Sequence, residues 1–228
     1  MLRRWRQGRR CSAKAKRCEQ PVLAQYLESC AALRPETIGD TPIIVVDIET
    51  TGLNAASDHI ISLGWTLIDN GRIRLGENRH VLVSAQSKVG KSATIHELTD
   101  KEVSSGIPVD EALEQLFMAA AGRVWVFHHS ALDISFLKKA CRAWASMLAP
   151  FTYLDTMQIE LGLRKRRNQP VQQGDLQLGQ LRSQYNLPRY TAHNALTDAL
   201  ATAELLLAMA SRLDRKKSLD LGPFLRFA

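Results

Sequence analysis

The chain has 228 residues, of which 45% are hydrophobic and 23% are charged, a composition that is ordinary for one or two globular domains. A chain of this length can bury a hydrophobic core without disulfides or structural metals. We expect a cytoplasmic protein, because no stretch approaches the roughly 20 uncharged apolar residues of a membrane span and no apolar run follows the arginine-rich N-terminus.

The net charge of +7 comes from one end of the chain. Residues 1–18 contain eight Lys and Arg residues and no acidic residue, so the rest carries 22 basic and 23 acidic residues. Such a segment is either a solvated, disordered arm or an arm that contacts nucleic acid. A second basic cluster, residues 164–167, is expected in a loop, where it could bind the part of a nucleic-acid strand that flanks the site. The four cysteines match no zinc or redox motif, which favours reduced thiols.

The first half of the chain predicts a short helix and three strands. The helix is expected at 21–33, and a continuous β-branched run at 42–46 predicts a strand buried on both faces. Strands at 60–68 and 73–83 follow, joined by the hairpin turn Asp69-Asn70-Gly71. We expect an arm and helical lead-in at 1–40, a folded domain at 41–213 and a C-terminal tail at 214–228.

The second half predicts helices alternating with two more strands. A capping box at 99–102 starts a short helix, and Asp110 caps the next one. The remaining expected elements are a strand at 124–127, a helix carrying Phe136 and Trp144, a strand at 151–154, a helix capped by Asp155, and helices at 175–185 and 194–213. This order predicts an α/β fold with a mixed five-stranded sheet flanked by helices.

Two acidic residues end the first buried strand. Side chains alternate along a strand, so Asp47 and Glu49 project from the same face. Two carboxylates in that position repel each other and are costly to bury unless a cation neutralises them. The alternative is a strand end that emerges into solvent. The turn that follows, residues 50–53, contains Gly52, which lets the backbone approach a ligand closely.

Three further residues join this pair only when they are considered together. Asp133 lies on the core-facing edge of a helix start, where it could equally be an N-cap. His193 and Asp198 flank the start of the last helix, and alone they would be a surface histidine and a helix-start acid. A strand end and two helix starts are the places from which an α/β sheet gathers residues in one crevice.

Four carboxylates and a histidine suit phosphodiester hydrolysis. Oxygen ligands select Mg²⁺ or Mn²⁺ over zinc, and two such ions about 4 Å apart hold the attacking and leaving oxygens of a displacement at phosphorus. A histidine can take the proton from an attacking water near neutral pH.

Three motifs in this order resemble the histidine-type DEDD (DEDDh) 3′–5′ exonucleases, a family that includes the proofreading ε subunit of bacterial DNA polymerase III and ribonuclease T. They are residues 46–53, 128–137 and 193–199, the last with the His-x4-Asp spacing of the subtype, and residues 94–100 resemble a further family segment. The resemblance covers residues 41–211. It implies an RNase H-like fold, two Mg²⁺ or Mn²⁺ ions, and release of 5′-monophosphates from a 3′ end.

The resemblance also implies roles for individual residues. Asp47, Glu49, Asp133 and Asp198 would be metal ligands, with Asp47 between the ions, and His193 would be the general base. Thr50, Thr51, Gly52 and Leu53 would seat the terminal nucleotide, and His96 would contact it unless it is a capping or core histidine. Asp155 is interpreted as a helix cap rather than a fifth ligand.

The chain departs from the family pattern at two places. It has His128-His129 where the family usually has His-Asn, and Leu132 where an aromatic residue usually precedes the aspartate. Neither change removes a ligand, but both alter the local hydrogen bonding and substrate packing that the resemblance implies.

These observations favour an exonuclease acting on DNA in proofreading or repair. One alternative is an exoribonuclease of the ribonuclease T or oligoribonuclease type, because the metal site itself does not distinguish DNA from RNA. Another is a nucleic-acid-binding module that docks on a polymerase. The expected partners are single-stranded DNA or RNA 3′ ends and a polymerase. The polymerase would be a separate chain, since no polymerase domain fits in the remaining residues. No membrane association is expected.

Overall fold

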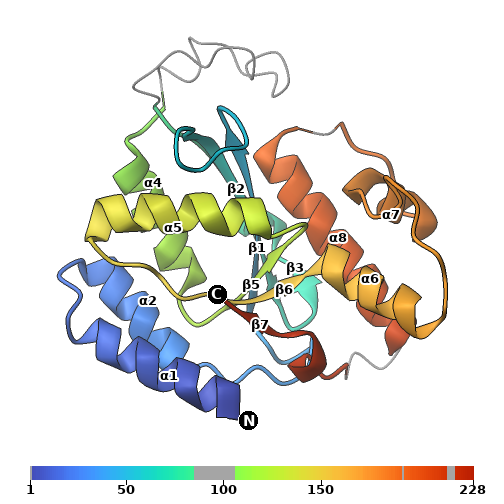
Figure 1. Ribbon diagram of the computed structural model, residues 1–228, viewed down its shortest axis with the longest axis horizontal. Helices are drawn as coiled ribbons and strands as arrows, with labels where there is room; N and C mark the ends of the chain where they lie inside the picture. Colours follow the sequence, from blue (N-terminus) through green and yellow to red (C-terminus); the bar gives the residue numbers. More distant parts are fainter. Residues whose placement is uncertain (1, 85–105, 192, 215–218) are drawn as a thin grey trace.

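A mixed β-sheet forms the centre of the protein, in a computed structural model that describes residues 2–84, 106–191, 193–214 and 219–228 (Figure 1). The strand order is β3-β2-β1-β5-β6-β7, and β4 also pairs with β2. The strands are β1 Ile43–Thr50, β2 Ile60–Asp69, β3 Arg72–Ile73, β4 Arg79–Leu82, β5 Val124–Phe127, β6 Thr152–Asp155 and β7 Arg226–Phe227. Strand β1 pairs antiparallel with β2 and parallel with β5, so the predicted mixed α/β sheet is confirmed.

Helices cover both faces of this sheet (Figure 1). One face packs against α1 Leu2–Ala15, α2 Pro21–Ala32, α4 Val109–Ala120 and α5 Ala131–Ala145. The other packs against α6 Thr156–Arg166, α7 Leu178–Gln184 and α8 Ala195–Leu213. Strand β1 is buried between the two layers because its apolar side chains alternate: Ile44 and Val46 enter the first core, and Ile43 and Val45 enter the second. Asp47 and Glu49 continue the face of Ile43 and Val45, which α8 covers.

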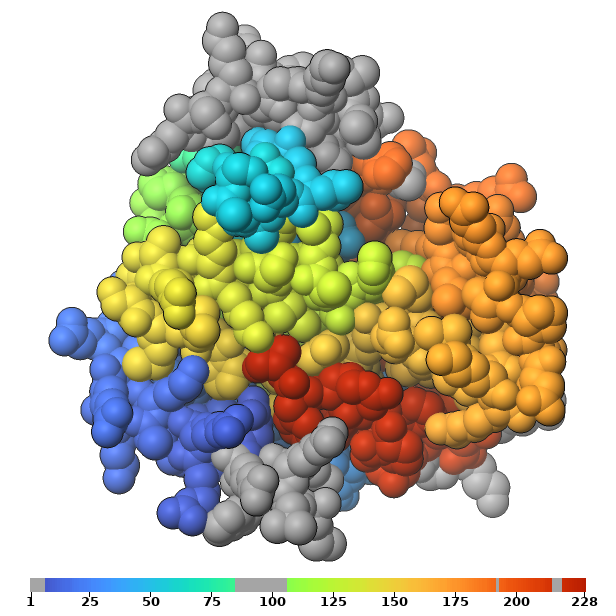
Figure 2. Space-filling view, viewed as in Figure 1, coloured from blue at the N-terminus to red at the C-terminus, as the bar shows by residue number. Residues whose placement is uncertain are grey.

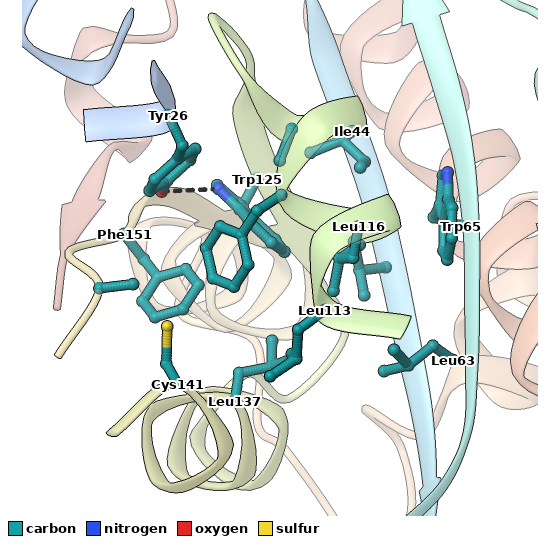
Figure 3. Close-up of a cluster of buried hydrophobic side chains, with 14 of the residues drawn as sticks. Tyr26, Ile44, Leu63, Trp65, Leu113, Leu116, Trp125, Leu137, Cys141 and Phe151 are labelled. Atoms are coloured by element: carbon teal, nitrogen blue, oxygen red, sulfur yellow. Dashed lines mark hydrogen bonds between the residues drawn. The ribbon is translucent and has the colours of Figure 1, made fainter. Parts of the chain in front are cut away.

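An aromatic cluster ties α2 to the sheet (Figure 3). The Trp125 indole N–H donates a hydrogen bond to the Tyr26 hydroxyl at 3.0 Å, and that hydroxyl donates to the Pro150 carbonyl at 2.7 Å. Phe117 packs edge-on against Tyr26, Phe151 packs edge-on against Trp125, and the two phenylalanine rings are tilted against each other. The buried polar atoms of Tyr26 and Trp125 are therefore paired, as rings in a core require.

The basic N-terminal segment is not a disordered arm where the structure describes it. Residues 2–15 form α1, which packs on α2 and places Cys11 in the first core with none of its surface exposed. Cys11 and Ala15 are four residues apart, so they share one apolar stripe. The Lys14 ammonium donates to the Leu148 carbonyl at 2.6 Å. The C-terminal residues 226–227 likewise form β7, which pairs with β6 instead of trailing as a tail.

Several predicted elements differ in detail. The strand expected at 73–83 is interrupted by a 3-10 turn, Leu75–Glu77, and forms two strands, β3 and β4. With the further strand β7, the sheet has seven strands in the described residues rather than five. The hairpin turn before it is confirmed, because Asn70 and Gly71 both have positive φ. Pro108, not Asp110, precedes α4, and Asp110 lies in the first helical turn. The predicted helix at 99–102 lies outside the described residues. Among the helices that the structure describes, none has the length and apolar composition needed to cross a membrane.

Candidate active site

Three of the predicted carboxylates meet where β1 ends and α8 begins. Oxygens of Asp47, Glu49 and Asp198 all lie within 4.8 Å of one another. The first two come from alternate positions of β1, and Asp198 comes from the first turn of α8, which packs across β1 and β2. Glu49 is 6% exposed, and Asp47 and Asp198 are half-buried. These acids are gathered at a strand end, but they do not project freely into solvent.

Burial and mutual repulsion disfavour the charged form of these acids. Burial is the main cause that raises the pKa of Asp47 well above its ordinary value, followed by the charges of Asp133, Asp198 and Glu49. Burial, then the charges of Asp198 and Asp133, raise the pKa of Glu49 to about 8. Crowded carboxylates held partly out of water are the oxygen-only donor set that suits Mg²⁺ or Mn²⁺, so the residues present fit such ions.

Asp133 approaches the same acids from the opposite layer of helices. It lies buried in the first turn of α5, and burial raises its pKa to about 7. The backbone N–H groups of Asp133 itself and of Ile48 on β1 partly oppose this rise in pKa, because they favour the charged carboxylate. The group of three that share the 4.8 Å limit does not include Asp133, although its charge raises the pKa of Asp47.

His193 lies beside Asp198 in the loop before α8. It is exposed, its φ is +72°, and its backbone N–H donates to Asp198 Oδ2 at 2.9 Å. A positive φ is uncommon for a residue other than glycine. Asn194 then caps α8, since its side-chain oxygen accepts from the Thr197 N–H at 3.1 Å. The histidine and the acid are therefore held together by the backbone, which leaves the imidazole at the surface of the site.

The turn after β1 is held by its own hydrogen bonds. The Thr50 hydroxyl donates to the Gly52 carbonyl at 2.6 Å. Thr51 pairs with His59, its N–H donating at 2.9 Å and its hydroxyl accepting at 3.0 Å. Leu53 is 82% exposed, an unusual position for an apolar side chain next to buried carboxylates. His96, predicted to contact the substrate, lies outside the described residues.

Asp155 caps α6 and also binds the segment before α5, and only the cap could be predicted from the sequence. As predicted, it caps α6, accepting from the Gln158 N–H at 3.1 Å. Its other oxygen accepts from the N–H and the hydroxyl of Ser130, at 2.9 and 2.8 Å, and the His129 N–H also donates to Asp155 at 3.3 Å. Ser130 is 25 residues away, so no local sequence signal reveals this contact.

The structure also places the two departures from the family pattern and the second basic cluster. Both ring nitrogens of His128 are hydrogen-bonded, to the Thr156 hydroxyl at 2.8 Å and the Leu176 carbonyl at 2.9 Å. His129, which stands where the family usually has Asn, is exposed with a φ of +66°, and Leu132 packs against the first core. Arg164 is not in a loop: it is buried in the last turn of α6 and pairs with Glu160 at 3.1 Å and Asp175 at 2.9 Å. Its guanidinium is therefore engaged within the domain, because the end of α6 packs against the segment before α7.

Known proteins resemble this chain in sequence. The RNase T exonuclease family model matches residues 44–206. A DNA polymerase III PolC-type protein of Thermotoga maritima is 26% identical over 180 residues, 78% of this chain and 12% of that protein. A 3′-5′ exonuclease DinG of Staphylococcus haemolyticus is 25% identical over 179 residues, 78% of this chain and 19% of that protein. The chain thus spans less than a fifth of the length of these curated relatives.

Solved structures share the fold at low sequence identity. Escherichia coli Exonuclease I in complex with a dT13 oligonucleotide matches with a TM-score of 0.64 and 14% identity, over 78% of this chain and 42% of that one. The Mg²⁺- and Mn²⁺-bound form of Pop2p from S. pombe matches with a TM-score of 0.63 and 18% identity, over 81% of this chain and 88% of that one. The family match covers most of the chain and includes the strand and helices that carry the acids, so this protein belongs to the RNase T/DEDDh family of 3′–5′ exonucleases.

Proposed function

We propose that this exonuclease removes nucleotides from the 3′ end of DNA, at single-stranded, frayed or mismatched ends, and releases 5′-monophosphates. The observation that carries the proposal is the convergence of Asp47, Glu49 and Asp198 within 4.8 Å, with the buried Asp133 close enough to raise the pKa of Asp47. DNA is favoured as the substrate by the relatives named as DNA polymerase III and by the fold neighbour solved with dT13. Association with a DNA polymerase is proposed on the same relatives.

Each acid has a proposed part in holding divalent metal ions. Asp47, Glu49, Asp133 and Asp198 would hold two Mg²⁺ or Mn²⁺ ions, and Asp47 has the place in the first motif that the family resemblance assigns to the ligand shared between them. When bound, such ions would activate the attacking water and stabilise the charge that develops on the leaving oxygen. The rigid end of β1 and the capped start of α8 keep the ligands in place.

His193 is the proposed general base. Its imidazole is exposed, while its backbone is tied to Asp198, so the ring lies next to the acids without being buried among them. This position lets the ring accept the proton of an attacking water and pass it to solvent. Gln or Ala at 193 would keep the backbone bond and remove the base.

The turn from Thr50 to Leu53 is the proposed seat of the terminal nucleotide. Its internal hydrogen bonds set its shape before substrate arrives. Leu53, 82% exposed, offers an apolar surface on which a base can stack. Preorganisation of this kind favours binding, because little conformational freedom remains to be lost.

Helix α1, which carries the basic N-terminal residues, lies far from the acids at which the 3′ end would react. Lys14 contacts the residues after the C-terminal end of α5, whereas Asp133 lies in the first turn of that 15-residue helix, and such a helix spans roughly 22 Å. In Figure 2 the N-terminal helices (blue) lie at the lower left of the visible face and the cyan residues around the turn after β1 lie near its top, with the yellow to yellow-green residues of α5 between them. The proposal for α1 is thus contact with a flanking strand at a distance from the reacting 3′ end.

The decisive experiment compares matched substrates. Purified protein is incubated with Mn²⁺ and 5′-labelled single-stranded DNA, mismatched duplex, paired duplex or RNA of the same sequence, and with EDTA as the metal-free arm. We expect stepwise shortening from the 3′ end, fastest on single-stranded DNA, and none with EDTA. Faster cleavage of RNA would overturn the DNA assignment, and binding without cleavage under every metal condition would overturn the proposed metal chemistry at this site.

A further inference from the structure

We propose that Gly64 is a positioning residue for the metal site, although it is neither an acid nor part of any motif. Gly64 lies on β2 directly opposite Asp47 in the antiparallel register. A Cβ at this position would lie less than 3.0 Å from the backbone of Ala195 and Leu196, a separation that real Cβ atoms essentially never show. The inference rests on the proposed metal-binding role of the acids.

The contact involves backbone on both sides. The atoms that a Cβ would meet are the carbonyl group of Ala195 and the nitrogen of Leu196, so no side chain can turn aside to make room. These residues form the first turn of α8, and Asp198 lies three residues after Ala195. The missing side chain of Gly64 therefore lets the start of α8 rest directly on β2.

This close approach sets the distance between the ligands. Asp47 and Glu49 belong to β1, which is hydrogen-bonded to β2 along its length, whereas Asp198 belongs to α8. The sheet cannot yield easily around β1, because Ile43, Ile44 and Val45 are fully buried. A side chain at 64 must instead displace the start of α8, and Asp198 would move away from Asp47 and Glu49.

The contrast with other glycines shows that this constraint is specific. Gly162 and Gly179 lie in α6 and α7, and a Cβ built at either position has no heavy atom within 4 Å. Alanine there changes local helix propensity only. Gly162→Ala is therefore the matched control for Gly64→Ala.

The test measures Mn²⁺ binding separately from activity. Wild type, Gly64→Ala, Gly64→Val and Gly162→Ala are compared by Mn²⁺ titration calorimetry, thermal unfolding in EDTA, and cleavage of single-stranded DNA over a range of Mn²⁺ concentrations. We expect Gly64→Ala to remain folded, to bind Mn²⁺ about 10–100-fold more weakly, and to recover part of its activity as Mn²⁺ is raised. Gly64→Val should bind still more weakly, and Gly162→Ala should match wild type.

If Gly64→Ala does not fold, a second variant, Asn194→Ala, can still test the positioning of α8. Asn194→Ala removes the cap that holds the Thr197 N–H, so it loosens the first turn of α8 without adding atoms to the sheet. It should weaken Mn²⁺ binding in the same direction. Wild-type Mn²⁺ affinity in a folded Gly64→Ala, or in Asn194→Ala when Gly64→Ala is unfolded, would overturn the positioning role. Failure of the wild type itself to bind Mn²⁺ would refute the proposed metal ligands instead.

Discussion

The Asp155 carboxylate accepts two hydrogen bonds from Ser130, one from its backbone N–H at 2.9 Å and one from its hydroxyl at 2.8 Å. Asp155 ends β6, and Ser130 immediately precedes α5, which carries Asp133 in its first turn. This pair joins the end of one strand to the start of the helix that delivers a proposed ligand.

Replacing Asp155 tests that connection. Asp155→Ala removes bonds to Ser130, His129 and Gln158 and leaves the buried N–H and hydroxyl of Ser130 without their acceptor. We expect the free energy of unfolding to fall by about 2–3 kcal/mol, measured by urea denaturation, and cleavage to fall with it. Asp220→Ala, which removes one bond from an exposed acid to Gly222, is the control and should cost less than about 1 kcal/mol. Equal losses in the two variants would contradict the special role of Asp155.

Removing one of the crowded acids should separate activity from stability. Asp47→Asn is expected to abolish Mn²⁺-dependent cleavage, because a proposed shared ligand is lost. It should also raise the stability of the metal-free protein by about 1 kcal/mol, since asparagine removes the cost of placing an ionisable carboxyl group in a buried site among other acids. Cleavage assays and thermal unfolding in EDTA measure the two effects. Wild-type cleavage by this variant would contradict the proposed ligand set.

The metal-free protein should lose stability as pH rises. Glu49 titrates near its ordinary pKa of about 4.3 in the unfolded chain, but burial and its neighbours raise the pKa to about 8 in the folded state. Between these values the folded state binds more protons than the unfolded state, so the free energy of unfolding falls with increasing pH. Melting temperatures in EDTA should therefore decrease from about pH 5 to 8.

Two comparisons check that pH dependence. Glu49→Gln should flatten the decrease, because the titrating group is gone. Mn²⁺ should stabilise the wild type more at pH 8 than at pH 5, since metal ligands must be deprotonated. A melting temperature in EDTA that rises across this range in the wild type would show that the acids are charged in the folded state.

His193 should contribute to turnover and little to folding. His193 is exposed, and its backbone N–H donates to the Asp198 carboxylate, a bond that a substitution of the side chain leaves in place. His193→Gln is expected to lower kcat by about 10²–10⁴-fold, to keep Mn²⁺ affinity, and to leave the melting temperature unchanged. His59→Ala is the matched control, because His59 is also exposed and bonds Thr51 through its backbone alone. A variant at 193 with normal kcat would rule out the general-base role.

Arg164 should contribute to stability and not to substrate binding. It is buried and pairs with Glu160 and Asp175, so Arg164→Ala leaves a buried carboxylate without its partner and should cost about 3 kcal/mol of unfolding free energy. Lys165→Ala, next to it and exposed, should leave stability unchanged. Salt-dependent DNA binding measured for both variants provides the check. A loss of DNA affinity confined to folded Arg164→Ala would show that Arg164 contributes to DNA binding and would contradict this prediction.

Much of this protein follows from local patterns in the sequence. The buried β-branched run of β1, the Asn70-Gly71 turn, the Asp155 cap and the order of strands and helices are each specified by residues that are close together in the chain. The period-two alternation that places Asp47 and Glu49 on one face is also local. For that reason the fold class and the candidate acids could be predicted without coordinates.

Contacts between distant residues were decided only by the tertiary structure. Cys11 packs α1 into the core, the Arg164 guanidinium donates to the Gln184 side chain 20 residues away, and Ser130 contacts Asp155 across 25 residues. The backbone of Ala195 lies directly against Gly64, and no residue near Gly64 in the sequence indicates this contact. The local sequence indicates which polar groups need partners. The packing of the two helix layers on one sheet determines which partners these groups contact and how closely the acids approach one another.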